Sequence, residues 1–206
     1  MKTRGLLTWG LIPLLVSCTS IMTVQLPEFD DQITFHDGTD QYFDNGSLKR
    51  CRLSDTVLIQ GYSCTNWLHL NENGYLRQCE TTVDIPRSGF TIPAGSMLFF
   101  YDELPLKEHF INFSGPVIIN GIACKGGGKI STAFYESGSL SCCFPEQDIV
   151  IQGFPCKSSL TKPVYFYPDG RIQSLTLSED FQRDGDTFRK GETIGISETG
   201  KISRVI

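Results

Sequence analysis

Cysteine offers the widest choice of chemistry in this chain, which has eight cysteines and three histidines. A cysteine can act as a nucleophile beside a histidine, hold zinc in C-x-x-C pairs, close a disulfide or carry a lipid. The chain has no C-x-x-C pair, and His36, His69 and His109 recur at no metal-ligand spacing. The sequence therefore predicts no catalytic thiol, no metal site and no cofactor.

The first cysteine, Cys18, ends a stretch that is typical of an export signal. Lys2 and Arg4 precede the apolar run Leu6–Val16, which is too short to span a bilayer. The run continues into Leu15-Val16-Ser17-Cys18, which resembles the bacterial lipobox. The resemblance implies cleavage before Cys18, a diacylglyceryl group on its thiol, and membrane lipid as a partner.

This resemblance also implies a place in the cell. We expect a signal peptide over 1–17, a lipidated cysteine and tether over 18–31, and the folded domain over 32–206. Thr19 follows the cysteine, where aspartate commonly marks retention at the inner membrane, so the bacterial outer membrane is favoured over the inner one. The net charge of −5 and the lack of a basic cluster argue against nucleic acid as a partner.

Glycine-centred hairpin motifs recur along the rest of the chain. In each motif an aromatic or aliphatic residue is followed by a short polar run and then by Gly-x-Leu or Gly-x-Ile. Asn-Gly, Asp-Gly and Ser-Gly between alternating apolar residues are typical of β-hairpins, because glycine accepts a positive φ. The predicted turn glycines are Gly46, Gly74, Gly138, Gly170 and Gly200; between Gly74 and Gly138 one copy has lost its glycine.

A second glycine motif, I-x-G-x-x-C, alternates with the first. It is clearest at Gly61, Gly121 and Gly153, which we also predict to be turn glycines, and weaker at Gly89 and Gly185, with steps of 28, 32, 32 and 32 residues. A single hairpin is barely stable in water, but stacked hairpins bury a continuous face. The sequence therefore predicts an all-β fold of tandem β-hairpin repeats, about 28–32 residues each, stacked as an elongated sheet or solenoid-like array.

Alignment of the copies predicts which positions form the core. Four residues before the hairpin glycine stand Tyr42, Leu70, Phe134, Phe166 and Ile196, and two after it stand Leu48, Leu76, Leu140, Ile172 and Ile202. Both columns are apolar, so we expect each to form a buried row. An aspartate column precedes the I-x-G motif (Asp55, Asp84, Asp148, Asp180), and side-chain-to-backbone bonding in turns explains it better than catalysis.

Six of the remaining cysteines occupy two further columns, one three residues after the I-x-G glycine and one five residues after the hairpin glycine. Cys64, Cys124 and Cys156 alternate with Ile92 and Phe188, and Cys51, Cys79 and Cys143 alternate with Leu175. Such exchange favours buried, unpaired thiols in a hydrophobic core, with Cys142 as an extra one. The alternative is a pair of disulfides, Cys51–Cys64 and Cys143–Cys156, which an oxidising compartment would promote.

The F-Y-x-x-G-x-L/I units resemble the hairpin repeats of MORN proteins and of the YwqK-type antitoxin-like family. The likeness extends over most of residues 42–202, and the long period, the I-x-G-x-x-C motif and the cysteine columns depart from it. The resemblance implies a structural repeat and no active-site residues.

Together these patterns predict a lipid-anchored, non-enzymatic scaffold or binding module of the bacterial cell envelope. Its partner would be a protein or another envelope ligand, and Trp67, Tyr75 and Tyr101 are the candidate binding face. The alternative is an envelope enzyme or envelope-biogenesis factor with a site formed across repeats. A deep cleft with perturbed titratable groups would favour the enzyme, and an exposed aromatic face would favour binding.

Overall fold

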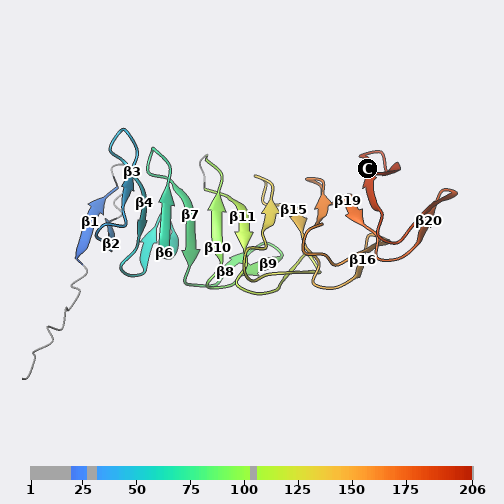
Figure 1. The fold of residues 1–206 in the computed structure, drawn as a ribbon, viewed down its shortest axis with the longest axis horizontal. Helices are drawn as coiled ribbons and strands as arrows, with labels where there is room; N and C mark the ends of the chain where they lie inside the picture. The colour runs from blue at the N-terminus through green and yellow to red at the C-terminus, as the bar shows by residue number, and fades with distance from the viewer. Residues whose placement is uncertain (1–19, 27–31, 103–105, 206) are drawn as a thin grey trace, which may run out of the picture.

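A computed structural model describes residues 20–26, 32–102 and 106–205 of the chain. Within these residues every regular element is a β-strand, and neighbouring strands pair antiparallel. Figure 1 shows the strands stacked side by side along the long axis, from the N-terminal strands at one end to the C-terminal strands at the other. The predicted all-β class and the elongated array of stacked hairpins are confirmed.

One long sheet of 13 strands forms the body of this array. Consecutive strands pair, so the sheet grows along the chain from its N-terminal edge, with β5 (Val57–Ile59) beside the first part of β6. From that edge the strands are β3 (Gln41–Tyr42), β4 (Leu48–Arg52), β6 (Tyr62–Leu70), β7 (Leu76–Thr81), β10 (Met97–Phe100), β11 (Glu108–Asn112), β14 (Thr132–Phe134), β15 (Leu140–Cys143), β18 (Val164–Phe166), β19 (Ile172–Thr176), β22 (Thr193–Ile196) and β23 (Ile202–Arg204).

The I-x-G motifs form a second set of hairpins, here called the small hairpins. The first is β5 with the start of β6, and the other four are separate two-stranded sheets. These four are β8 (Ile85–Arg87) with β9 (Phe90–Ile92), β12 (Val117–Ile119) with β13 (Ile122–Cys124), β16 (Ile149–Ile151) with β17 (Phe154–Cys156), and β20 (Phe181–Arg183) with β21 (Asp186–Phe188).

The N-terminal end of the array is formed by a further hairpin, β1 (Ile21–Gln25) with β2 (Gln32–His36). Strand β1 lies inside the segment 18–31 that the sequence predicts to be a tether, so that part of the expectation is corrected. The physical reason is burial: Leu26 and Phe35 are nearly inaccessible to solvent, and Phe35 forms a β-bridge with Leu53. These apolar side chains attach the hairpin to the end of the core.

The core lies between one face of the long sheet and the small hairpins. Both predicted columns contribute to it, and six column cysteines are fully buried, as expected for core thiols. Tyr42 is an exception, because its side chain is 47% exposed. It belongs to β3, the N-terminal edge of the long sheet, where no preceding strand of this sheet covers it.

The aspartate column fastens the base of the small hairpins. The Asp84, Asp148 and Asp180 carboxylates each accept a hydrogen bond from the backbone N–H ten residues further on, at 2.8, 2.7 and 2.8 Å. The expectation of side-chain-to-backbone bonding is therefore confirmed at these three positions.

Candidate functional site

The hairpin glycines of the long sheet are scaffold residues. At Gly170 the φ angle is +84°, its N–H donates to the Tyr167 carbonyl at 2.8 Å, and the Tyr167 N–H donates to the Arg171 carbonyl at 2.8 Å. The Phe166–Ile172 pairing then shifts register, as in a three-residue turn with a glycine bulge. Gly46, Gly74, Gly138 and Gly200 have positive φ and equivalent hydrogen bonds.

The I-x-G glycines form a different turn. Gln152 and Gly153 both have positive φ, +51° and +83°, which is the type I′ geometry of a two-residue hairpin. Gln60 with Gly61 and Asn120 with Gly121 repeat it. The eight predicted turn glycines are thus all at φ > 0, and their role is to close hairpins.

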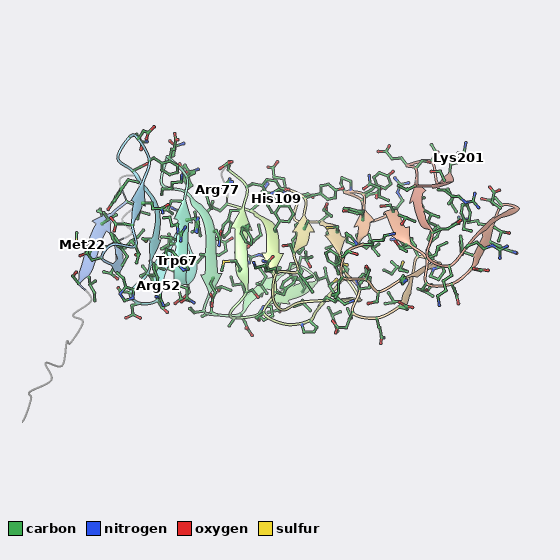
Figure 2. The ribbon with its side chains drawn as sticks, viewed as in Figure 1. Met22, Arg52, Trp67, Arg77, His109 and Lys201 are labelled. Carbon is green, nitrogen blue, oxygen red and sulfur yellow. The ribbon has the colours of Figure 1, made fainter. Side chains whose placement is uncertain are left out.

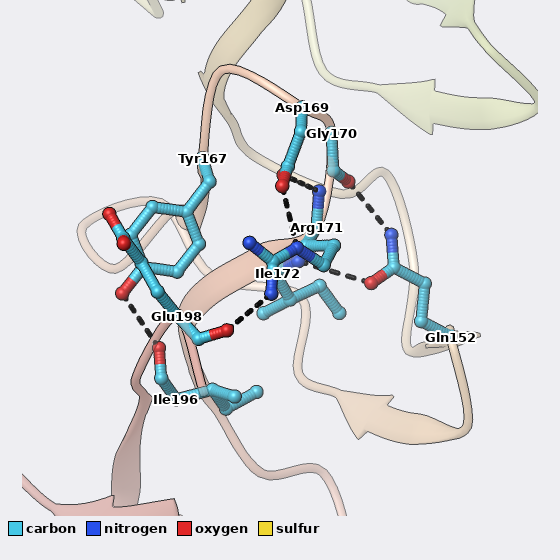
Figure 3. A network of polar contacts seen from close by, with 8 residues as sticks. All are labelled: Gln152, Tyr167, Asp169, Gly170, Arg171, Ile172, Ile196 and Glu198. Atoms are coloured by element: carbon cyan, nitrogen blue, oxygen red, sulfur yellow. Dashed lines mark hydrogen bonds and ion pairs between the residues drawn. The ribbon is translucent and has the colours of Figure 1, made fainter. Parts of the chain in front are cut away.

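A glutamine clamp joins each of two small hairpins to the long sheet. The Gln152 side-chain amide donates to the Gly170 carbonyl at 2.8 Å, and its oxygen accepts from the Ile172 N–H at 3.1 Å (Figure 3). Gln60 binds Gly74 and Leu76 in the same way, at 2.8 and 3.0 Å. The strained φ of these glutamines therefore serves a contact between layers.

A tyrosine ladder connects successive hairpins of the long sheet. The hydroxyls of Tyr101, Tyr135 and Tyr167 donate to backbone carbonyls of Phe134, Phe166 and Ile196 at 2.8, 2.8 and 2.9 Å. Each bond crosses one intervening strand. Its acceptor is the residue just before the next ladder position, so that Phe134 precedes Tyr135 and Phe166 precedes Tyr167. Figure 3 includes the last rung, from Tyr167 to Ile196.

The face of the long sheet that points away from the small hairpins, here called the open face, has no second layer within the described ranges. Because side chains alternate across a strand, one paired residue from each strand lies on this face. The row that crosses it is Gln41, Arg50, His69, Gln78, Phe99, Phe110, Ala133, Cys142, Tyr165, Ser174, Gly195 and Ser203. In this row Phe110 is 37% and Tyr165 is 43% exposed.

The centre of the open face carries an aromatic patch, defined as Phe99, Tyr101, His109 and Phe110. The His109 ring stacks on Tyr101 and on Phe110, with ring centroids 4.2 and 3.9 Å apart. Phe99 pairs directly with Phe110 on the neighbouring strand. Figure 2 shows His109 near the turn end of the long sheet. This stack is large, apolar and partly open to solvent, which is the anatomy of a recognition surface.

The candidate binding residues from the sequence occupy three different places. Tyr101 belongs to the aromatic patch, and Trp67 lies on the open face two strands away from β10, with the Arg50 guanidinium 4.0 Å from its ring centroid. Tyr75 lies in the Gly74 turn, where its N–H donates to the Asn71 side-chain oxygen at 2.9 Å. The structure therefore brings Tyr101 and Trp67 onto one face and leaves Tyr75 at its edge.

Sequence reasoning missed Phe99, His109, Phe110 and Tyr165. Period-two alternation was the available signal for Phe99, Phe110 and Tyr165, because each neighbours a buried residue of the same strand. His109 follows no such signal, because it is the extra residue at the register shift between Phe99–Phe110 and Phe100–Glu108. The sequence alone does not show that these residues form one patch. Their proximity depends on the register between neighbouring strands, which the hairpin turns set.

The imidazoles of this face are neutral at pH 7. Burial, and then the nearby Arg77 charge, lower the pKa of His109, and burial followed by Arg50 lowers the pKa of His69. The ring of His109 therefore stacks as an uncharged aromatic group. The phenol of Tyr101 is protonated, because burial and the Glu136 carboxylate raise its pKa.

The described cysteines are free thiols, and in Cys51, Cys79, Cys142, Cys143 and Cys156 the raised pKa disfavours the reactive thiolate. Burial raises the pKa of Cys51 to about 12 and that of Cys156 to about 11. Contact with the Cys64 thiol and then burial raise the pKa of Cys79, and Cys124 acts on Cys143 in the same way. The thiol neighbours are thus Cys64 with Cys79 and Cys124 with Cys143. The alternative bridges Cys51–Cys64 and Cys143–Cys156 differ from these contacts, and Cys156 acts on Cys143 more weakly than Cys124 does.

No cluster of three or more His, Cys, Asp or Glu side chains arranged for a metal ion occurs in the described part of the chain. Nor does that part contain a helix of the length and apolarity needed to cross a membrane. Cys18, the predicted lipidation site, lies outside the described residues.

The chain matches no protein-family model, no curated protein and no solved structure with which it was compared.

Proposed function

We propose that this protein is a lipid-anchored, non-enzymatic binding module of the bacterial cell envelope, which holds its ligand on the open face of the long sheet. The lipobox-like Leu15–Cys18 motif supports the anchor, and Thr19 favours the outer membrane. Acyl chains contribute about 0.8 kcal/mol per buried methylene, so two chains hold a protein stably at a bilayer. The folded repeats then present the open face to the surrounding envelope.

The aromatic patch is the observation that carries this proposal. Tyr101, His109 and Phe110 form a continuous stack on a face that carries no second layer of described strands. Stacked rings offer a rigid apolar surface at little cost in conformational entropy, which is why aromatic residues dominate binding surfaces.

The shape of the face favours an elongated ligand. The ladder tyrosines Tyr101, Tyr135 and Tyr167 follow successive hairpins, two strands apart, and strands are spaced about 4.8 Å. Their rings therefore repeat about every 10 Å along the long axis. A chain-like envelope component could contact several of them at once.

The physical state of the thiols argues against the enzyme alternative. Cys51 and Cys156 are buried and protonated at neutral pH, so neither supplies a thiolate. The histidines of the open face stack on rings or lie beside Arg50 and do not orient a nucleophile.

Co-sedimentation of the purified, unlipidated protein (Cys18→Ser) with isolated bacterial envelopes tests the proposal. We expect saturable binding that weakens at least tenfold in the double variant Phe110→Ser/Tyr165→Ser. The matched control is Leu58→Ser/Val150→Ser, which removes two aliphatic side chains, each 65% exposed, from the small hairpins. Equal binding by both double variants would place the ligand elsewhere, and absence of saturable binding would refute a binding module for the envelope.

A further inference from the structure

The repeat is broken at one place inside its core. In the column two residues after the hairpin glycine, all the other copies have Leu or Ile, but the copy without a glycine has Glu108. In the column two residues before the I-x-G glycine, the same repeat has Arg87 where Ile59, Ile119 and Ile151 are buried. The last copy also has an arginine there, Arg183, but that side chain is 49% exposed and the other column of that copy keeps Ile202. Two aliphatic core positions are thus replaced by an acid and a base.

These two side chains form an ion pair with each other. The Arg87 guanidinium contacts the Glu108 carboxylate, and their side chains are only 31% and 14% exposed. The Tyr62 hydroxyl from the preceding repeat donates to the same carboxylate at 3.0 Å and accepts from Arg87 at 3.3 Å. The pair is therefore held in a defined geometry by a third polar group.

A hollow of about 250 Å³ lies beside this ion pair, between the small hairpin β8–β9 and the Gly138 turn. Its apolar wall contains Phe90 and Phe134, whose rings stack with centroids 5.3 Å apart. A second ion pair borders it, with the Lys107 ammonium 3.3 Å from the Glu136 carboxylate. Two cations, two anions and an aromatic wall thus converge on one small space.

The charges of the hollow restrict what can bind there. The two cations and two anions cancel, so a net anion or a net cation is attracted by one pair of these groups and repelled by the other. A zwitterion can use both pairs, because its carboxylate can accept from Arg87 and Lys107 while its ammonium donates to the two glutamates. An apolar side chain on that zwitterion would cover the rings of Phe90 and Phe134.

An ion pair at these two positions is also not expected to stabilise the fold more than apolar residues would. Replacing a buried ion pair by well-packed apolar residues is often neutral or stabilising, and the neighbouring repeats already use Ile and Leu there. A role in binding accounts for the presence of both charges in the same repeat.

We propose that this hollow is a binding site for a small zwitterion with an apolar side chain, such as a free amino acid or the linked ends of a short peptide. The lining of the hollow includes no residue of the aromatic patch, so the inference does not rest on the proposed function. Binding exchanges part of each internal ion pair for an ion pair with the ligand, and no covalent step is involved.

Titration calorimetry of the folded chain with L-phenylalanine, and with N-acetyl-L-phenylalaninamide as the uncharged analogue, tests the inference. We expect saturable binding of L-phenylalanine at millimolar or lower concentration and at least tenfold weaker binding of the amide. The variant Arg87→Ile/Glu108→Leu restores the residues of the other repeats; we expect it to melt no lower than the wild type and to bind L-phenylalanine at least tenfold more weakly.

Glu108→Gln serves as a second variant, because it keeps the size and hydrogen-bonding capacity of the side chain and removes only its charge. We expect it also to weaken binding, whereas Val150→Ser, at an exposed position of another small hairpin that does not line the hollow, should leave the affinity for L-phenylalanine unchanged. Equal affinity for the amide, full binding by both hollow variants, or no saturable binding by the wild type would each overturn the inference.

Discussion

The Tyr167 hydroxyl donates a 2.9 Å hydrogen bond to the Ile196 carbonyl, across the intervening strand β19. With the two equivalent bonds from Tyr101 and Tyr135, it ties each hairpin of the long sheet to the following one. At the position equivalent to these tyrosines, the first two hairpins have Phe43 and Asn71 and the last has Ser197. The ladder therefore covers the central and C-terminal hairpins, and these should resist local opening better than the N-terminal ones.

Tyr167→Phe should lower the free energy of unfolding by about 0.5–1.5 kcal/mol, because the Ile196 carbonyl loses its side-chain donor. Urea unfolding monitored by circular dichroism measures the change. Tyr165→Phe is the matched control, since that phenol lies two residues earlier and is 43% exposed. Equal losses in both variants would mean that the ladder bond adds nothing beyond the ring.

Gly170→Val should cost about 1–2 kcal/mol, because valine resists the φ of +84° that the turn requires. A Cβ added at this glycine would meet no atom within 4 Å beyond the neighbouring residues, so the cost is conformational and not steric. Ser137→Ala, one place before the equivalent Gly138, should be nearly silent in the same urea titration. A comparable loss at both sites would contradict the turn geometry.

Much of this scaffold was predictable because its signals are local. The glycine turns and the alternating flanks of the long sheet follow from residue type and spacing, as Gly170 and Ile172 illustrate. Tyr42 was predicted to be buried but is exposed, because an alignment of the repeats does not show which strand lies at the edge of the sheet. Strand β1 was missed because its burial depends on contact between its hairpin and the end of the core.

The small hairpins and the two candidate sites depend on contacts that are distant in sequence. Strands of three residues, such as Ile149–Ile151, are too short for alternation to identify them, and the positive φ of Gln152 is supported by its contact with Gly170. The Arg87–Glu108 pair could have been found as a joint exception in two aliphatic columns. Because that repeat lacks its hairpin glycine, the alignment of the repeats does not assign Glu108 to the Leu/Ile column.

Cys18→Ser should abolish acylation and leave the protein unprocessed or soluble. The serine hydroxyl does not replace the thiol that receives the diacylglyceryl group in the lipobox-like motif. Radiolabelled fatty acid incorporation and detergent-phase partitioning provide the measurements. If the variant still enters the detergent phase with its signal removed, the lipoprotein proposal is wrong.

Thiol counting should find all seven described cysteines free after denaturation without reductant, since each is a thiol in the fold. A count of three would mean that four of these seven cysteines form two bridges. The thiol contacts then predict Cys64–Cys79 and Cys124–Cys143 as the bridged pairs, which peptide mapping can identify. Mapping to Cys51–Cys64 would contradict the strand register.

Alkaline pH should destabilise the fold through its buried thiols. Burial raises the pKa of Cys156 from 9.0 to about 11, so the folded state keeps a proton that the unfolded state releases above pH 9. The stabilisation linked to this proton is complete below pH 9 and is lost as the pH rises from 9 to 11. The loss from this thiol is roughly 2–3 kcal/mol, since one pKa unit corresponds to about 1.4 kcal/mol.

Cys156→Val isolates this effect, because Ile92 occupies the same column in another repeat and valine does not titrate. Urea unfolding at pH 8 and pH 11, in the presence of reductant, should give a smaller drop in the free energy of unfolding for the variant than for the wild type. Tyrosine and lysine titrations are common to both proteins and cancel in the difference. Equal drops in the two proteins would mean that the Cys156 thiol titrates alike in the folded and unfolded chains, which is incompatible with its full burial.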